Sequence, residues 1–535
     1  MEVSMKKEDI KKLGLQKGNL LKPREPYDGR MSWPIIFGDG QYLVVKGMEK
    51  ANVDYYQPKC KPVYYTLYYT WEDNYFQGVP IYGDIAEAVE SLARGQTLEL
   101  DGGVPVKLHE LVEKKFSTSI TDGAEKVKVN IYKMSPTTVE DNLGKIAPSI
   151  KEAALKWVRS LNMEAEDIKS IEETFSRPVK LFALLQPILS GVDSLLCTSP
   201  VNLGALTSVK LQDIEEDTYA VYDKKTVYLL TPQKLNYGHL SLETEQVSLR
   251  DAFDKLLTGA VGIEEEDLKV RDYQLIRNKC VGLSNALREW REASTYMDLP
   301  FYILGASITV QCQEKALAYL KNNLGITESQ FHQYYLNCLD EMANSLNLPL
   351  LSMKEWFTLV HSGDRTLLPS PPVDHHITTK SNSVKIDSGV IVLYDGVLRA
   401  VSDLARSLAI SKEAKAIYEI CRKTVKEFII PSTFTGKEAR NVYVETMRQL
   451  KEIFDEIKVT GLMPEGKSLD LFERDFGHTM NRETAVTIFL QNDNTKPINE
   501  GMVGCSEMHW PYKNHAPGFE DSWVVGPKRA INFTS

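Results

Sequence analysis

The stretch IDSGVIVLYDGVLRAVSDLAR, residues 386–406, decides the fold of the C-terminal half of this chain. Two apolar, β-prone segments, 390–393 and 397–401, flank an Asp-Gly turn signal at residues 395 and 396. The pattern predicts an antiparallel hairpin centred on residue 395. Asp387 and Asp403 each lie eight residues from that centre. Simple pairing therefore predicts that these two carboxylates face each other, about 5 Å apart.

Carboxylates at that separation repel each other unless a cation lies between them, so the pair indicates metal binding. Three further short contexts downstream carry side chains of the same kind: Phe476-Gly477-His478, the segment 501–507 that ends in Glu507, and the segment 518–521 that contains Glu520. Four carboxylates and one imidazole suit Mn, Fe, Co or Zn, and bridging carboxylates suit two ions better than one. We therefore predict a site for two divalent metal ions.

The order Asp, Asp, His, Glu, Glu in these contexts resembles the pita-bread metallohydrolases, a family that includes aminopeptidase P, prolidase, methionine aminopeptidase and creatinase. The family pattern reads Ile-Asp-x-Gly, Asp-x-Thr-Arg-Thr, Gly-His-x-x-Gly, Gly-Met-x-x-x-x-Glu-Pro-Gly and Ile-Glu-Asp. The resemblance covers the C-terminal half of the chain. Matched motif by motif, it implies that the metal ligands are Asp387, Asp403, His478, Glu507 and Glu520.

The sequence also departs from the family pattern. The hairpin is longer than the usual family spacing, and Met508-His509 follow Glu507 in place of Pro-Gly. Two family histidines that handle protons in the peptidases are missing, because Ser370 and Ala485 stand at their positions. A hydrolase needs a group that protonates its leaving amine. Either another residue took that role or the chemistry changed.

Two other histidines are candidates for the missing proton carrier. His509 lies two residues after Glu507 on an expected strand, so it shares a face with that ligand. The alternative for His509 is a partner that orients a carboxylate. His376 lies in the loop before the hairpin, and its alternative is an ordinary polar loop residue.

The rest of the chain predicts an α+β fold with three parts. Residues 1–175 form an N-terminal mixed α/β domain. Residues 176–264 form a second α/β domain, in which a hairpin around Asp223-Lys224-Lys225 resembles the small N-terminal domain of creatinase and prolidase. Residues 265–535 form the pita-bread metal-binding domain, where Thr327-x-x-Gln330 predicts a capping box at the start of a helix.

The composition is typical of a globular protein, with 43% hydrophobic and 25% charged residues among 535. A net charge of −10 argues against a nucleic-acid partner. The sequence lacks an apolar run of about 18 residues and a signal-peptide core, so we expect a cytoplasmic protein without a membrane partner. The seven cysteines are scattered without a Cys-x-x-Cys pair, which argues against a disulfide framework. Cys505, close to Glu507, is interpreted as a small packing residue.

The leading hypothesis is a metal-dependent enzyme that acts on a small carbon–nitrogen bonded compound, such as an amide, a short peptide, a guanidino compound or an amino-acid-like metabolite. The missing histidines argue against ordinary Xaa-Pro cleavage. Two alternatives stay open: a non-catalytic binding protein that kept the fold and the metal for stability, and a true Xaa-Pro aminopeptidase whose proton carriers moved to His509 and His376. The resemblance further implies a homodimer.

Overall fold

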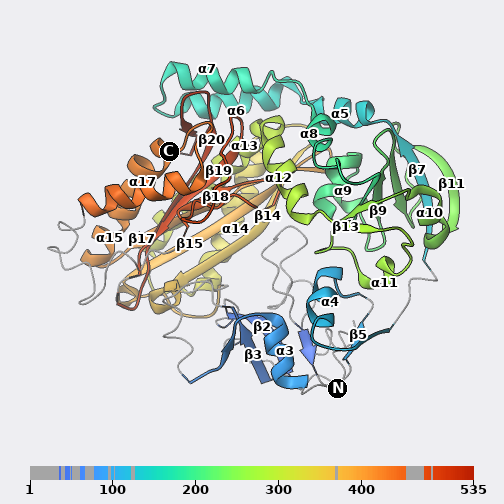
Figure 1. Ribbon diagram of the computed structural model, residues 1–535. Coiled ribbons are helices and arrows are strands. Elements are labelled where there is room, and N and C mark those ends of the chain that lie inside the picture. The colour runs from blue at the N-terminus through green and yellow to red at the C-terminus, as the bar shows by residue number, and fades with distance from the viewer. Residues whose placement is uncertain are drawn as a thin grey trace.

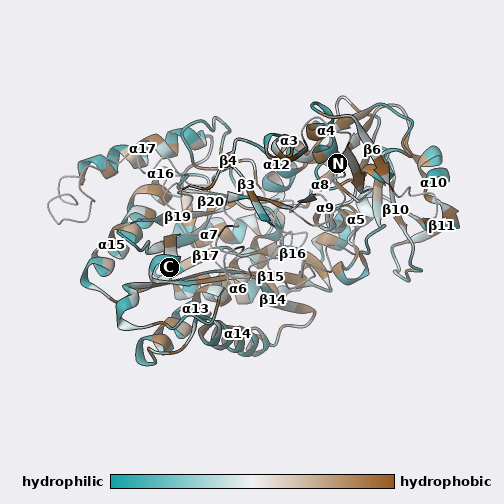
Figure 2. Cartoon of the chain, turned by 90° about the horizontal axis from the view of Figure 1, so that it is seen from below, coloured by the Kyte–Doolittle hydropathy of each residue, from teal (hydrophilic) through white to brown (hydrophobic). Residues whose placement is uncertain are grey.

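The computed structural model describes residues 35–37, 42–47, 50, 53, 61–66, 78–93, 98–101, 103–121, 127–367, 372–453, 475–483, 486–511 and 513–534. Within these ranges the strands form separate sheets that follow one another along the chain (Figure 1). Helices at the periphery, such as α14, α15 and α17, carry both hydrophilic and hydrophobic residues (Figure 2). In the described part of the chain, the helices are too short or too polar to cross a membrane.

The first part of the chain is a small α/β module, drawn in blue in Figure 1. Its main sheet has the order β1-β2-β3-β4, and a two-stranded parallel sheet of β5 and β6 lies in the same part of the chain. Helices α3 and α4 contribute buried apolar residues to a shared core. The elements are β1 (Ile35–Phe37), β2 (Tyr42–Lys46), β3 (Lys61–Tyr65), β4 (Ile81–Tyr82), α3 (Ile85–Ala93), β5 (Leu98–Asp101), α4 (Val106–Glu113) and β6 (Thr118–Thr121).

A seven-stranded sheet follows, with the strand order β11-β7-β10-β9-β8-β12-β13. The predicted hairpin is confirmed as β9 and β10, which pair antiparallel with Tyr222 opposite Val227. The sheet extends past both boundaries suggested by the sequence, 175/176 and 264/265, because β7 pairs with β10 and β13 pairs with β12. The strands are β7 (Lys128–Met134), β8 (Ser194–Cys197), β9 (Tyr219–Tyr222), β10 (Val227–Thr231), β11 (Ser241–Ser248), β12 (Val261–Ile263) and β13 (Cys280–Gly282).

Helices cover both faces of this sheet and connect it to the C-terminal half. They build two apolar cores, one on each side of the central strands. The helices are α5 (Pro136–Gly144), α6 (Pro148–Ser160), α7 (Ala165–Thr174), α8 (Leu181–Leu185), α9 (Pro200–Thr207), α10 (Leu249–Leu256), α11 (Val270–Tyr273) and α12 (Ser284–Ser294). Of these, α6 and α7 leave the sheet and pack into the core of the C-terminal half.

The C-terminal half begins with a sheet built around the long strand β15 (Ser383–Tyr394). Strand β14 (Leu351–Ser362) pairs along one side of β15, and β16 (Val397–Val401) and β17 (Leu404–Ala409) pair along the other, end to end. Helices α13 (Leu299–Asn322) and α14 (Glu328–Ser345) pack against this sheet through a large apolar core. The capping box predicted at the start of α14 is confirmed, since Thr327 and Gln330 cap each other's backbone N–H groups.

The hairpin predicted from the Asp-Gly signal is confirmed as β15 and β16. Asp395 and Gly396 both have positive φ angles, 50° and 77°, as a type I′ turn requires. The predicted pairing of Asp387 with Asp403 is wrong, because Asp387 pairs with Ala405. The two-residue turn pairs Tyr394 with Val397, which shifts the register by one residue from the expected one, and a β-bulge at Arg399 shifts it by one more.

A second four-stranded sheet, in the order β18-β19-β20-β21, lies beside the first. Side chains of β17 join the two sheets: Ser407 Oγ donates to the carbonyl of Gly518, and the Arg406 guanidinium pairs with Asp521 at 2.6 Å. Helices on the outer side bury a separate apolar core against this sheet. The elements are α15 (Lys412–Lys423), the π-helix 424–429, α16 (Ile430–Ser432), α17 (Ala439–Glu452), β18 (Gly477–Thr479), β19 (Val503–His509), β20 (Gly518–Val525) and β21 (Ala530–Asn532).

The bulged Arg399 is buried and belongs to an ionic group that holds three elements together. Its Nε donates to Asp298 Oδ1 at 2.6 Å, just before α13 begins. Asp298 Oδ2 accepts from the Arg482 guanidinium at 2.6 Å, four residues after His478. All three side chains are buried. One carboxylate therefore ties α13, the bulged strand and the segment after β18 to one another.

We expect Asp298→Asn to lower the free energy of unfolding by about 3 to 5 kcal/mol, because two buried guanidinium groups lose their shared counter-ion. Asp395→Asn is the matched control, since Asp395 pairs with Lys210 on the exposed turn of the same hairpin. That variant should lose less than about 1 kcal/mol. Urea unfolding of both variants checks this, and equal losses would contradict the role given to Asp298.

Candidate metal centre

The residues expected as metal ligands come from both C-terminal sheets. Asp387 lies in β15, and Asp403 lies in the short break between β16 and β17. His478 is the central residue of β18, Glu507 lies in β19 and Glu520 in β20. The two sheets meet where β17 packs against β20. The contact therefore brings the first two candidates toward the other three.

Strand pairing within the second sheet sets the positions of three of these residues. Glu507 and Glu520 are direct cross-strand partners, and His478 is the partner of Cys505. Gly477 has a φ angle of 116°, and a Cβ there would lie 2.3 Å from the carbonyl oxygen of Cys505. Only glycine fits this close approach of β18 to β19. The Gly-His pair of the motif is thereby explained by packing.

Gly389 has an equivalent role in the first sheet. A Cβ at Gly389 would lie 2.0 Å from the carbonyl oxygen of Ser402. The backbone N–H of Val390 donates to Ser402 Oγ at 2.9 Å, which holds the break between β16 and β17 against β15. Asp403 follows directly. The glycine after Asp387 therefore permits the backbone position from which Asp403 reaches the site.

Asp403, His478, Cys505 and Glu520 form a buried cluster whose potential ligand atoms all lie within 4.8 Å of one another. The Nδ1 atom of His478 lies 2.7 Å from the carbonyl oxygen of Thr479, which places the ring proton on Nδ1. Nε2 then carries the lone pair and lies 3.7 Å from Asp403 Oδ2. Two acceptors face each other in this arrangement, which a cation between them would stabilise.

The carboxylates of Asp387 and Glu507 interact electrostatically with the cluster. Burial raises the pKa of Glu520 well above its ordinary value, and the negative charges of Asp403, Glu507 and Asp387 raise it further, in that order. Burial also raises the pKa of the Cys505 thiol, and Glu520 and Asp403 add to the effect. The site thus concentrates negative charge where water does not screen it, which is the condition that a bound cation relieves.

His509 lies on the same face of β19 as Glu507, and its Nε2 lies 2.6 Å from Glu507 Oε2. On its other side, Nδ1 lies 3.1 Å from the buried Lys385 Nζ. The ammonium of Lys385 only donates, so Nδ1 accepts and Nε2 donates its proton to Glu507. Both ring nitrogens are thus engaged. The geometry favours a residue that holds Glu507 in place, and a role as proton carrier stays a prediction.

The second candidate, His376, is not brought to the cluster. Its side chain is exposed, and its Nδ1 lies 2.8 Å from the carbonyl oxygen of Gly325, in the loop before α14. Ser370 and Ala485, at the positions of the missing family histidines, lie outside the described residues.

Two residues at this site are not among the ligands that the sequence predicts. Cys505 reads from the sequence as a packing residue, and Lys385 lies in no motif of the sequence analysis. Each lies two residues before an expected ligand on the same strand, Cys505 before Glu507 and Lys385 before Asp387. Because side chains two residues apart on a strand share a face, this spacing is the signal that could have found both.

The donor set fits divalent transition metals. Two carboxylates, one imidazole and one thiol converge within the cluster, and two more carboxylates act on it electrostatically. Carboxylate and imidazole donors suit Mn, Fe, Co and Zn, and a thiol adds a soft donor. Burial of all four clustered side chains would exclude bulk water from an ion held there.

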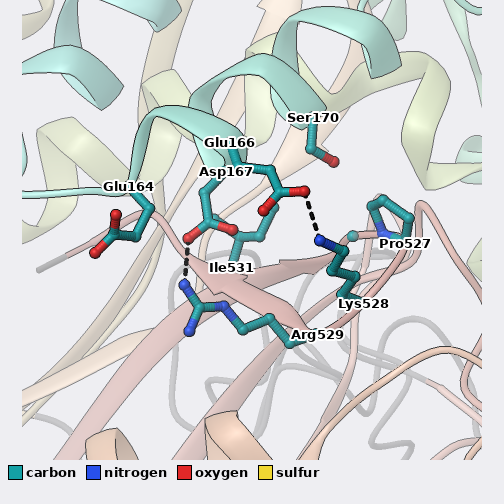
Figure 3. A pocket seen from close by; sticks show the side chains of 9 residues that line it. Glu164, Glu166, Asp167, Ser170, Pro527, Lys528, Arg529 and Ile531 are labelled. Atoms are coloured by element: carbon teal, nitrogen blue, oxygen red, sulfur yellow. Dashed lines mark hydrogen bonds and ion pairs between the residues drawn. The ribbon is translucent and has the colours of Figure 1, made fainter.

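A cavity of about 480 Å³ lies elsewhere, between α7 and the turn from β20 to β21 (Figure 3). Two ion pairs cross it: Glu166 with Lys528 at 2.6 Å, and Asp167 with Arg529 at 2.7 Å. None of the clustered residues lines this cavity. The ion pairs attach α7 to the second sheet, so we assign this cavity to the packing of the two halves.

Comparisons with known proteins agree with this geometry. The family model of metallopeptidase family M24 matches residues 305–527, which include all five expected ligands. No curated protein matches the sequence.

Solved structures with the same fold include a prolidase from Pyrococcus furiosus (17% identity, TM-score 0.51, covering 66% of this chain and 99% of that one). They also include a dipeptidase from Pyrococcus horikoshii OT3, with 16% identity and a TM-score of 0.52, covering 68% of this chain and 98% of that one. An X-Pro aminopeptidase from Thermotoga maritima MSB8 has 16% identity and a TM-score of 0.50, covering 66% of this chain and 97% of that one. At these identities the likeness shows the fold alone. The fold is the expected α+β pita-bread architecture, and residues 305–527 are similar to metallopeptidase family M24.

Proposed function

We propose that this protein is a metal-dependent enzyme that holds two divalent ions, Mn, Fe, Co or Zn, and acts on a small carbon–nitrogen bonded substrate. The observation that carries the proposal is the buried convergence of Asp403, His478 and Glu520, with Asp387 and Glu507 close enough to raise the pKa of Glu520. The match to a metallopeptidase family supports metal-dependent, peptidase-type chemistry.

A divalent ion held by these residues would supply Lewis acidity toward a carbonyl or amide oxygen. The chain's own residues supply orientation. Nδ1–H of His478 donates to Thr479, so the ring presents Nε2 to the site. His509 Nε2–H donates to Glu507 Oε2 and fixes that carboxylate, while Lys385 fixes His509. Partners of this kind orient ligands and set their basicity.

Arg406 holds the two sheets in register at the site. Its guanidinium donates to the carbonyl of Glu520 and pairs with Asp521 at 2.6 Å. The same guanidinium stacks on the ring of Phe519, 4.3 Å from its centroid. Because Asp403 and Arg406 belong to one short segment, this clamp sets the separation between Asp403 and Glu520.

The substrate class that we propose is an amide, a short peptide, a guanidino compound or an amino-acid-like metabolite. Its basis is the family match together with Ser370 and Ala485 at the positions of the two proton-handling histidines. The second candidate function, a true Xaa-Pro aminopeptidase with a relocated proton carrier, is favoured only by His509, which touches Glu507. A non-catalytic binding protein that kept the metal for stability would retain the same donor set, and turnover of a substrate by the metal-loaded chain would separate an enzyme from it. A cytoplasmic homodimer without nucleic-acid or membrane partners remains part of the proposal.

Metal content tests the site directly. We expect the full chain, purified mildly and saturated with Mn, Fe, Co or Zn, to bind about two ions per chain, because the buried carboxylates need counter-ions. Asp403→Ala should bind fewer than about one metal ion per chain while remaining folded. Asp395→Asn should bind as many ions as the unmodified chain does. Elemental analysis decides this. Less than about half an ion per unmodified chain would contradict the proposal.

The peptidase alternative calls for a substrate test. We expect the metal-loaded chain to hydrolyse Xaa-Pro dipeptides with kcat/KM about 100- to 10,000-fold below a prolidase assayed beside it, since general acid catalysis contributes about that much. Comparable turnover by the unmodified chain, abolished in His509→Ala, would show instead that an ordinary peptidase has moved its proton carrier to His509.

The role of His509 can be separated from that of a proton carrier by metal affinity. If His509 holds Glu507, His509→Ala should weaken metal binding by about 10- to 100-fold. His376→Ala is the control and should bind metal normally, because His376 is exposed and contacts the loop before α14. Isothermal titration with zinc measures both. Unchanged affinity in His509→Ala would contradict the positioning role.

A further inference from the structure

Cys505 occupies a position in β19 that directs its side chain into the candidate metal centre. Side chains alternate between the two faces of a strand, so residues 505, 507 and 509 share one face of β19. The thiol therefore points to the same side as Glu507 and His509. Its cross-strand partners are His478 on β18 and Ser522 on β20. The thiol is fully buried. A packing role alone would not require this residue to face the carboxylates.

The distances around Cys505 match those of a ligand. Its Sγ lies 3.6 Å from His478 Nε2, which itself lies 3.7 Å from Asp403 Oδ2. Donors bound about 2.0 to 2.3 Å from a tetrahedral ion stand about 3.3 to 3.8 Å from one another. The Sγ–Nε2 and Nε2–Oδ2 distances are therefore those of neighbouring ligands around one ion, and Glu520 completes a group of four within 4.8 Å. Sγ also lies 3.7 Å from His478 Nδ1.

The surroundings of Cys505 are those of a potential ligand. Its Sγ contacts the His478 ring and lies in a group that also contains Asp403 and Glu520. A thiol that coordinates a divalent ion is deprotonated. Cys421, another buried cysteine, lies outside the cluster: its Sγ lies 3.7 Å from the carbonyl oxygen of Pro517.

We propose that Cys505 is a thiolate ligand that joins Asp403, His478 and Glu520 around one metal ion. The inference rests on the metal-dependent function proposed above. On binding, the S–H bond breaks, the proton leaves to solvent, and a sulfur lone pair is donated to the ion. A ligand set that includes a thiolate favours softer metals than a set of only oxygen and nitrogen donors does. The site therefore prefers Zn²⁺, Co²⁺ or Fe²⁺ over Mn²⁺, and the two ions occupy chemically different positions.

Cobalt spectroscopy of the full chain tests this ligand. The protein is stripped of metal with a chelator and titrated with Co²⁺, which reports its ligands through visible d–d bands and, when a thiolate is bound, an intense near-ultraviolet charge-transfer band. We expect both bands in the unmodified chain and in Cys421→Ser, which removes an equally buried thiol. Cys505→Ser should keep the d–d bands and lose the charge-transfer band.

X-ray absorption of the zinc-loaded, unmodified chain gives a second readout that needs no variant to fold. We expect one sulfur scatterer at about 2.3 Å beside oxygen and nitrogen at about 2.0 to 2.1 Å. Competition between Zn²⁺ and Mn²⁺ for the site is a third readout. We expect Cys505→Ser to lower the affinity for zinc at least about tenfold and the affinity for manganese much less.

The outcomes separate this inference from the function on which it rests. Cobalt binding with d–d bands but no charge-transfer band, and only oxygen and nitrogen around zinc, would overturn the thiolate ligand and leave the metal-dependent function standing. Failure of the unmodified chain to bind cobalt or zinc at all would overturn both. A charge-transfer band that persists in Cys505→Ser and disappears in Cys421→Ser would assign the sulfur elsewhere and also overturn the inference.

Discussion

The C-terminal half of this protein depends on one electrostatic constraint: carboxylates buried on paired strands face one another. Glu507 and Glu520 are direct cross-strand partners, and like charges in that relation destabilise a sheet. Asp403 approaches them from the other sheet. A fold that keeps such a group buried must hold it rigidly and supply counter-charge. The glycines at 389 and 477, the Arg406 clamp and the chain from Lys385 through His509 to Glu507 all serve that arrangement.

A second buried charge determines how the first sheet reaches the site. Asp298 binds Arg399 and Arg482, which flank Asp403 and His478 in the sequence. Pairing with Asp298 keeps the Arg399 side chain buried at a β-bulge, and this bulge together with the two-residue turn gives Asp387 the partner Ala405 instead of Asp403. Asp403 then faces His478 rather than the other aspartate. The Asp298–Arg399 ion pair thus lies at the bulge that helps to set the pairing of β15 with β17, and the position of Asp403 depends on that pairing.

The candidate metal centre contains side chains about which the family match and the shared fold say nothing. The match to a metallopeptidase family covers residues 305–527, and the solved structures share the fold at low identity. Within that shared architecture, this chain places a thiol among its carboxylates and a lysine behind its histidine. The thiol adds a potential ligand to the proposed centre, and the lysine holds the histidine that contacts Glu507.

The sequence by itself determined the features that depend on neighbouring residues. The Asp395-Gly396 turn, the hairpin of β9 and β10 and the capping box at Thr327 follow from local turn and capping chemistry, and the order of the five expected ligands was visible as short motifs. Only the tertiary structure decided the rest. The bulge at Arg399 is stabilised by a partner 101 residues away, and the seven-stranded sheet unites β7 with β13. Cys505 becomes a potential ligand only where β18, β19, β20 and the break between β16 and β17 converge. These features arise from contacts between distant segments, which local patterns do not encode.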